Sequence, residues 1–118
     1  MTEKEASLQR KCQYIIRKYG GYIFKNNGNL YTETGRPDLT GCIPVSIDTF
    51  VELFGKDTKI GLFIGLELKR EGHLDEVSDA QKIVGQKIKN AGGLWFAVDD
   101  SKLVDALIAK LTGAQNDV

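Results

Sequence analysis

The fold is decided by one stretch, Gly61-Leu62-Phe63-Ile64-Gly65-Leu66-Glu67-Leu68-Lys69. Alternate residues of a strand point to the same face. One face therefore carries four apolar side chains, which we expect in the core: Leu62, Ile64, Leu66 and Leu68. The other face carries Glu67 and Lys69, with Gly65 beside them. A carboxylate and an ammonium at the end of a buried strand are unfavourable unless they are paired or bind a metal, so the stretch predicts a strand over Lys59–Lys69 that ends in a polar site.

A second acidic residue precedes another apolar run. Gly35-Arg36-Pro37-Asp38 leads into residues 39–45, and we predict a strand from Asp38 to Val45. Two acidic residues on adjacent strand ends can chelate a hard divalent cation through oxygen. Lys69 beside them can stabilise a developing anion or position a water. Asp38 alone would suit a turn; together with Glu67 and Lys69 we interpret it as a catalytic and metal-binding residue.

The remaining chain reads as alternating helices and strands. Apolar residues at helical spacing, glycine pairs and capping patterns set the boundaries. A strand–helix–strand step late in the chain implies a right-handed parallel crossover. We predict one α/β domain over residues 1–118, with a mixed central sheet flanked by helices and a frayed tail over 112–118. The predicted order is αβββαβα: helix 3–19, strands 22–25, 38–45 and 59–69, helix 78–91, strand 94–98 and helix 102–111.

Residues 46–59 fit this order least well. They could form a strand or one or two helical turns, and we interpret them as an irregular insertion with some helix. The segment holds five large apolar residues that the core cannot easily take: Ile47, Phe50, Val51, Leu53 and Phe54. An exposed apolar cluster needs cover, and a two-fold interface would cover it with the same surface of a second copy. The insertion therefore predicts a homodimer.

Composition limits the classes of protein that this chain can be. It has 16 basic and 16 acidic residues and no net charge, whereas proteins that bind phosphate backbones usually have a basic excess. Acidic metal ligands offset part of that difference, since a bound cation reverses the local sign. Cys12 and Cys42 are too few and too far apart for a zinc site, so we expect reduced thiols. We expect a cytoplasmic protein with no membrane partner, because no signal sequence or membrane-length apolar run occurs.

An ordered set of motifs resembles a known family. The motifs are Glu5-Ala6-Ser7-Leu8-Gln9, Gly20-Gly21, Gly35-Arg36-Pro37-Asp38-Leu39, Leu66-Glu67-Leu68-Lys69 and Asp79-Ala80-Gln81. Together they resemble the VRR-NUC family of PD-(D/E)XK nucleases, from about residue 5 to residue 99. The resemblance implies a restriction-endonuclease-like core, Mg²⁺ or Mn²⁺, and phosphodiester cleavage in branched DNA such as Holliday junctions, as in phage and repair nucleases.

The resemblance also implies further site residues. It makes the backbone carbonyl of Leu68 a metal ligand, Glu5 a metal-facing or water-orienting residue, and Gln81 a contact to water or phosphate. Two of these have an alternative role as helix caps, because Glu5 could complete a capping box with Thr2, and Gln81 one with Ser78. Both alternatives stay open at this point.

Three basic residues are candidate DNA contacts, although each could equally be surface charge: Lys25, Arg36 and Lys82. The expected function is a Mg²⁺- or Mn²⁺-dependent endonuclease for branched DNA, with two sites in a dimer. One alternative is a DNA-binding module of the same fold that does not cut. Another is a nuclease for linear duplex DNA or RNA. The motifs do not separate these functions, because substrate choice depends on surface shape.

Overall fold

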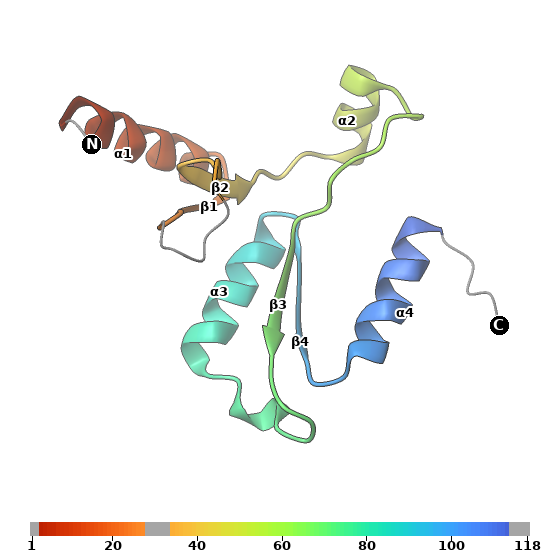
Figure 1. The fold of residues 1–118 in the computed structure, drawn as a ribbon. Coiled ribbons are helices and arrows are strands. Elements are labelled where there is room, and N and C mark those ends of the chain that lie inside the picture. Colours follow the sequence, from red (N-terminus) through yellow and green to blue (C-terminus); the bar gives the residue numbers. More distant parts are fainter. Residues whose placement is uncertain (1–2, 28–33, 114–118) are drawn as a thin grey trace.

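The computed structural model describes residues 3–27 and 34–113, which form four α-helices and four strands (Figure 1). This is a mixed α/β arrangement, as predicted. The elements are α1 (Glu3–Lys18), β1 (Tyr22–Lys25), β2 (Leu39–Cys42), α2 (Ile47–Phe54), β3 (Ile64–Leu68), the 3₁₀ turn η1 (Leu74–Glu76), α3 (Asp79–Asn90), β4 (Leu94–Val98) and α4 (Ser101–Thr112). The longest of these helices has 16 residues and is largely polar, and none of the described helices could cross a bilayer.

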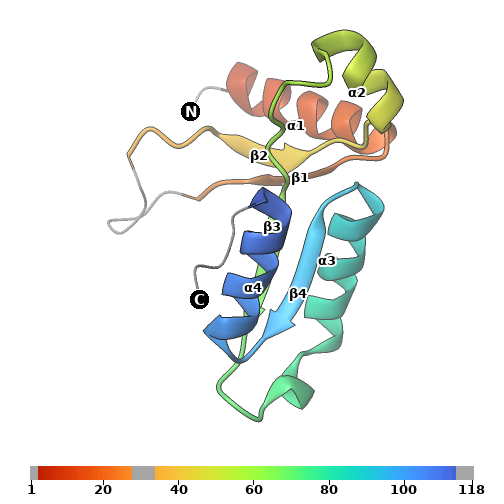
Figure 2. The same ribbon diagram turned by 90° about the vertical axis from the view of Figure 1, so that its right-hand side faces the viewer.

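The strands form two separate two-stranded sheets. β1 and β2 are antiparallel, with Tyr22 opposite Cys42, and β3 and β4 are parallel, with Glu67 opposite Ala97. The predicted parallel crossover through α3 is therefore present, but the single central sheet is not formed. β2 stops at Cys42, before Pro44, which has no backbone N–H for a ladder. From there the β1–β2 pair is turned away from the β3–β4 pair (Figures 1 and 2).

Helix ends follow the local sequence signals. α1 ends at Lys18, and the turn that follows it contains Gly20, whose φ of 86° suits glycine. α3 begins with the predicted capping box of Ser78 and Gln81, and Asp100 caps α4. α4 runs through Thr112 and so enters the predicted tail by one residue; residues 114–118 lie outside the described residues. Thr2 also lies outside them, so the capping box predicted for Thr2 is not described.

The segment predicted as an irregular insertion contains a regular helix, α2. The Ser46 hydroxyl accepts a hydrogen bond from the Thr49 backbone N–H at 3.1 Å, and Gly55 ends the helix with a φ of 83°. Apolar residues recur at i, i+3, i+4 and i+7 along α2, which is the spacing of an amphipathic helix. α2 packs closely against no other described helix or strand (Figure 1).

The β3–β4 pair lies between α3 and α4 (Figure 1), and only the α3 side is tightly packed. A Cβ placed on Gly85 would clash with the Trp95 ring, so α3 approaches the sheet at a residue without a side chain. The face of β3 that α3 covers carries Gly65, Glu67 and Lys69. The prediction of a buried apolar row was therefore wrong: Leu62, Ile64, Leu66 and Leu68 are all exposed.

The apolar row is exposed because α4 does not seal it. A groove of about 580 Å³, lined by Leu68, Val98, Val104 and Ile108 among others, separates α4 from the strand ends. Within the described residues the buried apolar core contains only Val77, Ile88, Ala91 and Val98. The radius of gyration is 17.2 Å, against about 13.5 Å for a compact chain of this length. The chain thus has an open shape that leaves sheet edges and apolar faces uncovered.

Candidate functional site

Three of the predicted catalytic residues meet where β3 ends and α3 begins. The Gln81 Nε2 donates to the Glu67 Oε1 at 2.7 Å, and the Lys69 Nζ lies 3.7 Å from the same oxygen. Both charged side chains are largely covered, with 28% of Glu67 and 18% of Lys69 exposed. The strand places Glu67 and Lys69 on one face because they are two residues apart, and α3 brings Gln81 over that face.

Gln81 has the capping role that the sequence left open, and its side chain also makes a contact that the sequence did not predict, to Glu67. Its Oε1 accepts from the Ser78 backbone N–H at 2.9 Å, while its own backbone N–H donates to the Ser78 hydroxyl at 3.1 Å. These two bonds form the capping box and fix the orientation of the carboxamide. The Nε2 is then directed at Glu67. One side chain therefore caps α3 and holds the candidate carboxylate.

Asp38 lies at the start of β2 and is exposed, in a loop that Asn26 organises. The Asp38 carbonyl accepts from the Asn26 backbone N–H at 2.9 Å. The Asn26 Nδ2 donates to the Pro37 carbonyl at 2.8 Å and to the Thr40 hydroxyl at 2.6 Å, and the Arg36 guanidinium donates to the Asn26 Oδ1 at 2.6 Å. No motif in the sequence singles out Asn26. Its importance follows from the β1–β2 pairing, which no local signal reveals.

The predicted metal-binding residues are not gathered into one place. Asp38 and Glu67 belong to different sheets, and no group of three or more His, Cys, Asp or Glu in the described part of the chain could hold a metal. Glu5 lies near the N-terminal end of α1, where it lines a separate pocket with Lys4, Leu8 and others. That end of α1 lies across the molecule from the end of β3 (Figure 1).

The three candidate DNA contacts are likewise dispersed. Lys25 is the last residue of β1 and is exposed, and Lys82 is exposed in the first turn of α3, next to Gln81. Arg36 is exposed as well, but its guanidinium is hydrogen-bonded to Asn26. We call Glu67, Lys69 and Gln81 the Glu67 cluster. Of the three candidate DNA contacts, only Lys82 adjoins this cluster.

Among the residues that the structure describes, β2 and β3 each have one unpaired edge. The Lys69 backbone N–H donates to the Val98 carbonyl at 3.0 Å, and the Phe63 carbonyl accepts from Leu94 at 2.9 Å. Since neighbouring residues of a strand direct their backbone groups to opposite edges, Ile64, Leu66 and Leu68 direct theirs away from β4. The Leu68 carbonyl therefore points to the open edge, as a metal ligand would require. By the same alternation the backbone groups of Leu39 and Gly41 point away from β1, because the Asp38 carbonyl points toward Asn26, the residue that directly follows β1.

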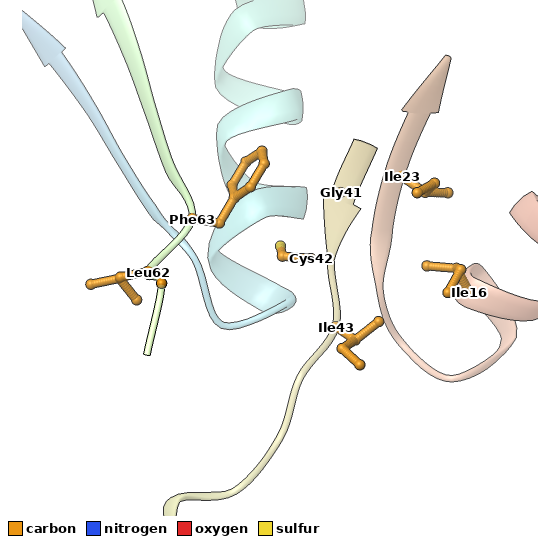
Figure 3. A pocket seen from close by; sticks show the side chains of 8 residues that line it. Ile16, Ile23, Gly41, Cys42, Ile43, Leu62 and Phe63 are labelled. Atoms are coloured by element: carbon orange, nitrogen blue, oxygen red, sulfur yellow. The ribbon is translucent and has the colours of Figure 1, made fainter. Parts of the chain in front are cut away.

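The two open edges meet at one end. Cys42 and Ile43 line a cleft of about 440 Å³ together with Leu62 and Phe63, and the two chain segments run in opposite directions there (Figure 3). The Tyr22 and Phe63 rings lie 6.1 Å apart at 64°, and Tyr22 is the partner of Cys42 across β1 and β2. Tyr22, Cys42 and Phe63 therefore follow one another across β1, β2 and the segment that leads into β3, and β2 and β3 diverge from that point.

Comparisons with protein-family models, with curated proteins and with solved structures found no match.

Proposed function

We propose that this chain is a Mg²⁺- or Mn²⁺-dependent endonuclease of the VRR-NUC type that cleaves branched DNA. The observation that carries the proposal is the half-buried Glu67 with Lys69 and Gln81 on its Oε1. A carboxylate and an ammonium on the covered face of a strand are unfavourable compared with apolar side chains. Their presence in a chain with few buried residues indicates a role in chemistry.

The residues of the cluster fit a cation. Within the described residues both contacts to Glu67 use Oε1, which leaves Oε2 for a metal. The carbonyl of the next residue, Leu68, is directed to the open edge of β3. Carboxylate and carbonyl oxygens are the ligands that Mg²⁺ and Mn²⁺ prefer. A second carboxylate is required, and Asp38 is the candidate.

Pairing of β2 with β3 would supply Asp38. Cys42 lies near Phe63, where the end of β2 approaches the start of β3. An antiparallel pair that continues from these two residues sets Thr40 opposite Gly65 and Asp38 opposite Glu67. This register also agrees with the directions of the backbone groups. The outward-pointing N–H and C=O groups of Leu39 and Gly41 would bond to those of Leu66 and Ile64. Asp38 and Glu67 would form a non-hydrogen-bonded pair, in which the Cα atoms are about 4.5 Å apart and both side chains share a face.

The apolar face supports the same register. It would set Leu39 beside Leu66 and Ile43 beside Leu62, so that rows of exposed or half-buried apolar side chains cover one another. The resulting sheet would have the order β1-β2-β3-β4, with β1, β2 and β3 antiparallel and β4 parallel to β3. That is the mixed sheet of a restriction-endonuclease-like core.

Each residue then has a defined task. Asp38, Glu67 and the Leu68 carbonyl would hold the cation, which supplies an activated water and shields the charge of the scissile phosphate. Gln81 fixes the orientation of Glu67 from the end of α3. Lys69 donates a hydrogen bond to the attacking water or to a phosphate oxygen, and Lys82 contacts the DNA backbone nearby.

The test is cleavage by the purified chain of a four-way junction, a flap, linear duplex, single-stranded DNA and RNA, with Mn²⁺, Mg²⁺ or EDTA. We expect metal-dependent cutting of the junction and none with EDTA. Asp38→Ala and Glu67→Ala should abolish cutting, whereas Asp57→Ala should not, because it removes an exposed carboxylate in the turn after α2.

Each alternative result has a clear meaning. Binding of the junction without cutting would support the non-cleaving module. Equal cutting of linear duplex or of RNA would retain the chemistry and change the substrate. Wild-type rates in Asp38→Ala or Glu67→Ala protein would refute the site.

A further inference from the structure

The outer side of α1 carries a concentrated positive charge. From Ala6 to Lys25 the sequence has five basic residues and no acidic one. The chain as a whole is neutral because acidic residues elsewhere balance this segment. Four of the five basic residues lie on α1 and are exposed: Arg10, Lys11, Arg17 and Lys18. The segment thus has a local net charge that the composition of the whole chain hides.

These four side chains share one face of the helix with Tyr14. Residues three or four apart lie side by side on a helix. Arg10 and Lys11 precede Tyr14 by four and three positions. Arg17 and Lys18 follow it by three and four positions. Tyr14 is 69% exposed. We call these five residues the α1 basic surface, in which four cations surround one phenol ring.

The opposite side of α1 is already packed. Ile16 lies two positions after Tyr14, which turns it by about 200° around the helix. It lines a cleft with Ile23 and Ile43 (Figure 3), and a Cβ placed on Gly21 would meet its side chain. α1 is therefore anchored to the β1–β2 pair through this side, and the α1 basic surface faces outward.

The charge of the α1 basic surface is not neutralised by the described part of the chain. A solvated helix face usually alternates the sign of its charges, so that residues four apart form ion pairs. Within the described residues none of the four cations is in an ion pair. The Arg17 guanidinium donates to the Ile23 carbonyl at 3.3 Å, and the Lys18 ammonium lies 5.7 Å from the Tyr19 ring centroid. Neither contact removes a charge, so a polyanion would relieve the repulsion among the cations.

The arrangement fits the phosphate backbone of duplex DNA. Arg10 and Lys18 are eight residues apart, which is about 12 Å along the helix axis. One strand of a duplex presents a phosphate about every 3.4 Å along its axis, so the surface faces about three or four phosphates. Guanidinium, ammonium and phenol groups all donate hydrogen bonds to phosphate oxygens. Such contacts read no base, and binding should be independent of sequence.

An anionic membrane is the other polyanion that a basic helix can bind. A helix that lies on a bilayer buries a broad apolar side opposite its cations. In α1 that side packs against the β1–β2 pair. Leu8 and Ile15 are exposed, but they are seven residues apart and form a single row. The packing of α1 therefore favours DNA over a membrane.

We propose that the α1 basic surface is a second contact for duplex DNA, separate from the Glu67 cluster. It holds the phosphate backbone without reading the bases. The proposal goes beyond cleavage, because this contact requires neither a metal nor the Glu67 cluster.

The test is fluorescence anisotropy of a labelled linear duplex with the full chain in EDTA, which prevents metal-dependent cutting, over about 50–200 mM salt. Four phosphate contacts give a plot of log K against log salt with a slope of about −3.6 or steeper. The double variant Arg10→Gln with Lys11→Gln removes two contacts. The slope should then fall in magnitude by about 1.8, and binding at about 0.1 M salt should weaken roughly fiftyfold. Both residues are exposed, and circular dichroism checks that the variant is folded.

A matched variant on α4 removes the same amount of charge. Lys102→Gln with Lys110→Gln replaces two exposed lysines on a helix to which no DNA contact is assigned. It should change neither the affinity nor the slope. Tyr14→Phe removes a neutral donor, so it should weaken binding roughly fivefold and leave the slope unchanged.

The outcomes separate this contact from its alternatives. An unchanged slope in the α1 double variant would overturn the proposal, and so would an equal fall in the α4 variant, because cations elsewhere would then hold the duplex. Vesicles of phosphatidylcholine and phosphatidylserine form a second arm. Vesicle binding that depends on the α1 basic surface, without duplex binding that does, would also overturn it. A slope that responds as expected in a chain that never cuts with Mn²⁺ would refute the nuclease and support this contact.

Discussion

A disulfide scan from Cys42 tests the register of β2 against β3. In a Cys12→Ser background, a cysteine introduced by Phe63→Cys should form an intramolecular disulfide with Cys42. The proposed register makes residues 42 and 63 a non-hydrogen-bonded pair, with Cα atoms about 4.5 Å apart, inside the range of about 4.4–6.8 Å that a disulfide spans. Diagonal neighbours on the same face are about 7–8 Å apart and lie outside it.

The expected stabilisation can be estimated from the loop that the disulfide closes. The loop from residue 42 to residue 63 has about 20 residues, for which loop-closure entropy gives about 3 kcal/mol. This corresponds to a rise in Tm of about 10 °C for a domain of this size. Burial raises the pKa of the Cys42 thiol, and a hydrogen bond from the Tyr22 backbone only partly offsets the rise. The thiolate fraction is therefore low at neutral pH, and oxidation should be run near pH 9.

Controls at neighbouring positions separate the possible registers. Gly61→Cys closes a loop of nearly the same length, and a Cβ at Gly61 meets no atom within 4 Å, so its failure to crosslink would reflect register alone. Leu62→Cys points to the other face and should also fail. Non-reducing gels and mass spectrometry after alkylation give the yields. Preferential crosslinking of Gly65→Cys would refute the reasoning, because that register sets Asp38 opposite Lys69 and forms an ion pair in place of a metal site.

Four further substitutions test the packing around the site and in the β1–β2 pair. Ser78→Ala and Gln81→Ala should each lower stability by about 1 kcal/mol in thermal unfolding, but only Gln81→Ala should reduce DNA cleavage. An equal loss of cleavage in both variants would mean that Gln81 acts only as a helix cap. Gly85→Ala puts a methyl group against the Trp95 ring and should cost about 1–3 kcal/mol in denaturant unfolding; a neutral effect would mean that α3 can move. Asn26→Ala should destabilise the β1–β2 pair by about 1–2 kcal/mol and speed its hydrogen exchange, and unchanged exchange would contradict the role of Asn26.

The elements predicted most accurately have strong local signals. β1 and β4 have the predicted bounds, and α1 and α3 end within one residue of theirs. Glycine pairs follow both helices, and a capping box starts α3. α2 was less clear because five apolar residues in eight suit a buried strand or a short helix equally well.

Long-range pairing was not predictable from local patterns. The alternation in residues 62–68 correctly separates the two faces of β3, yet it cannot say which face a neighbour covers. The polar face lies under α3 because Gly65 and Gly85 admit the Trp95 ring between them, and that contact joins distant parts of the chain. The hydrogen bonds of Asn26 could not be predicted for the same reason, because they too join distant parts of the chain. Gln81 could not be assigned to one role, since a single carboxamide has two.

The packing of Trp95 also has a spectroscopic consequence. It is the only tryptophan in the chain, it lies against Gly65 of β3 and Gly85 of α3, and the Lys89 ammonium lies 5.6 Å from its ring centroid. Intrinsic emission excited at the red edge of protein absorption therefore comes from one place, the contact that holds α3 over the Glu67 cluster. Displacement of α3 would change the polarity around the indole and its distance from the ammonium. The chain thus contains a built-in fluorophore whose emission wavelength and lifetime report the contact between α3 and the face of β3 that carries Glu67 in stopped-flow mixing, without a label.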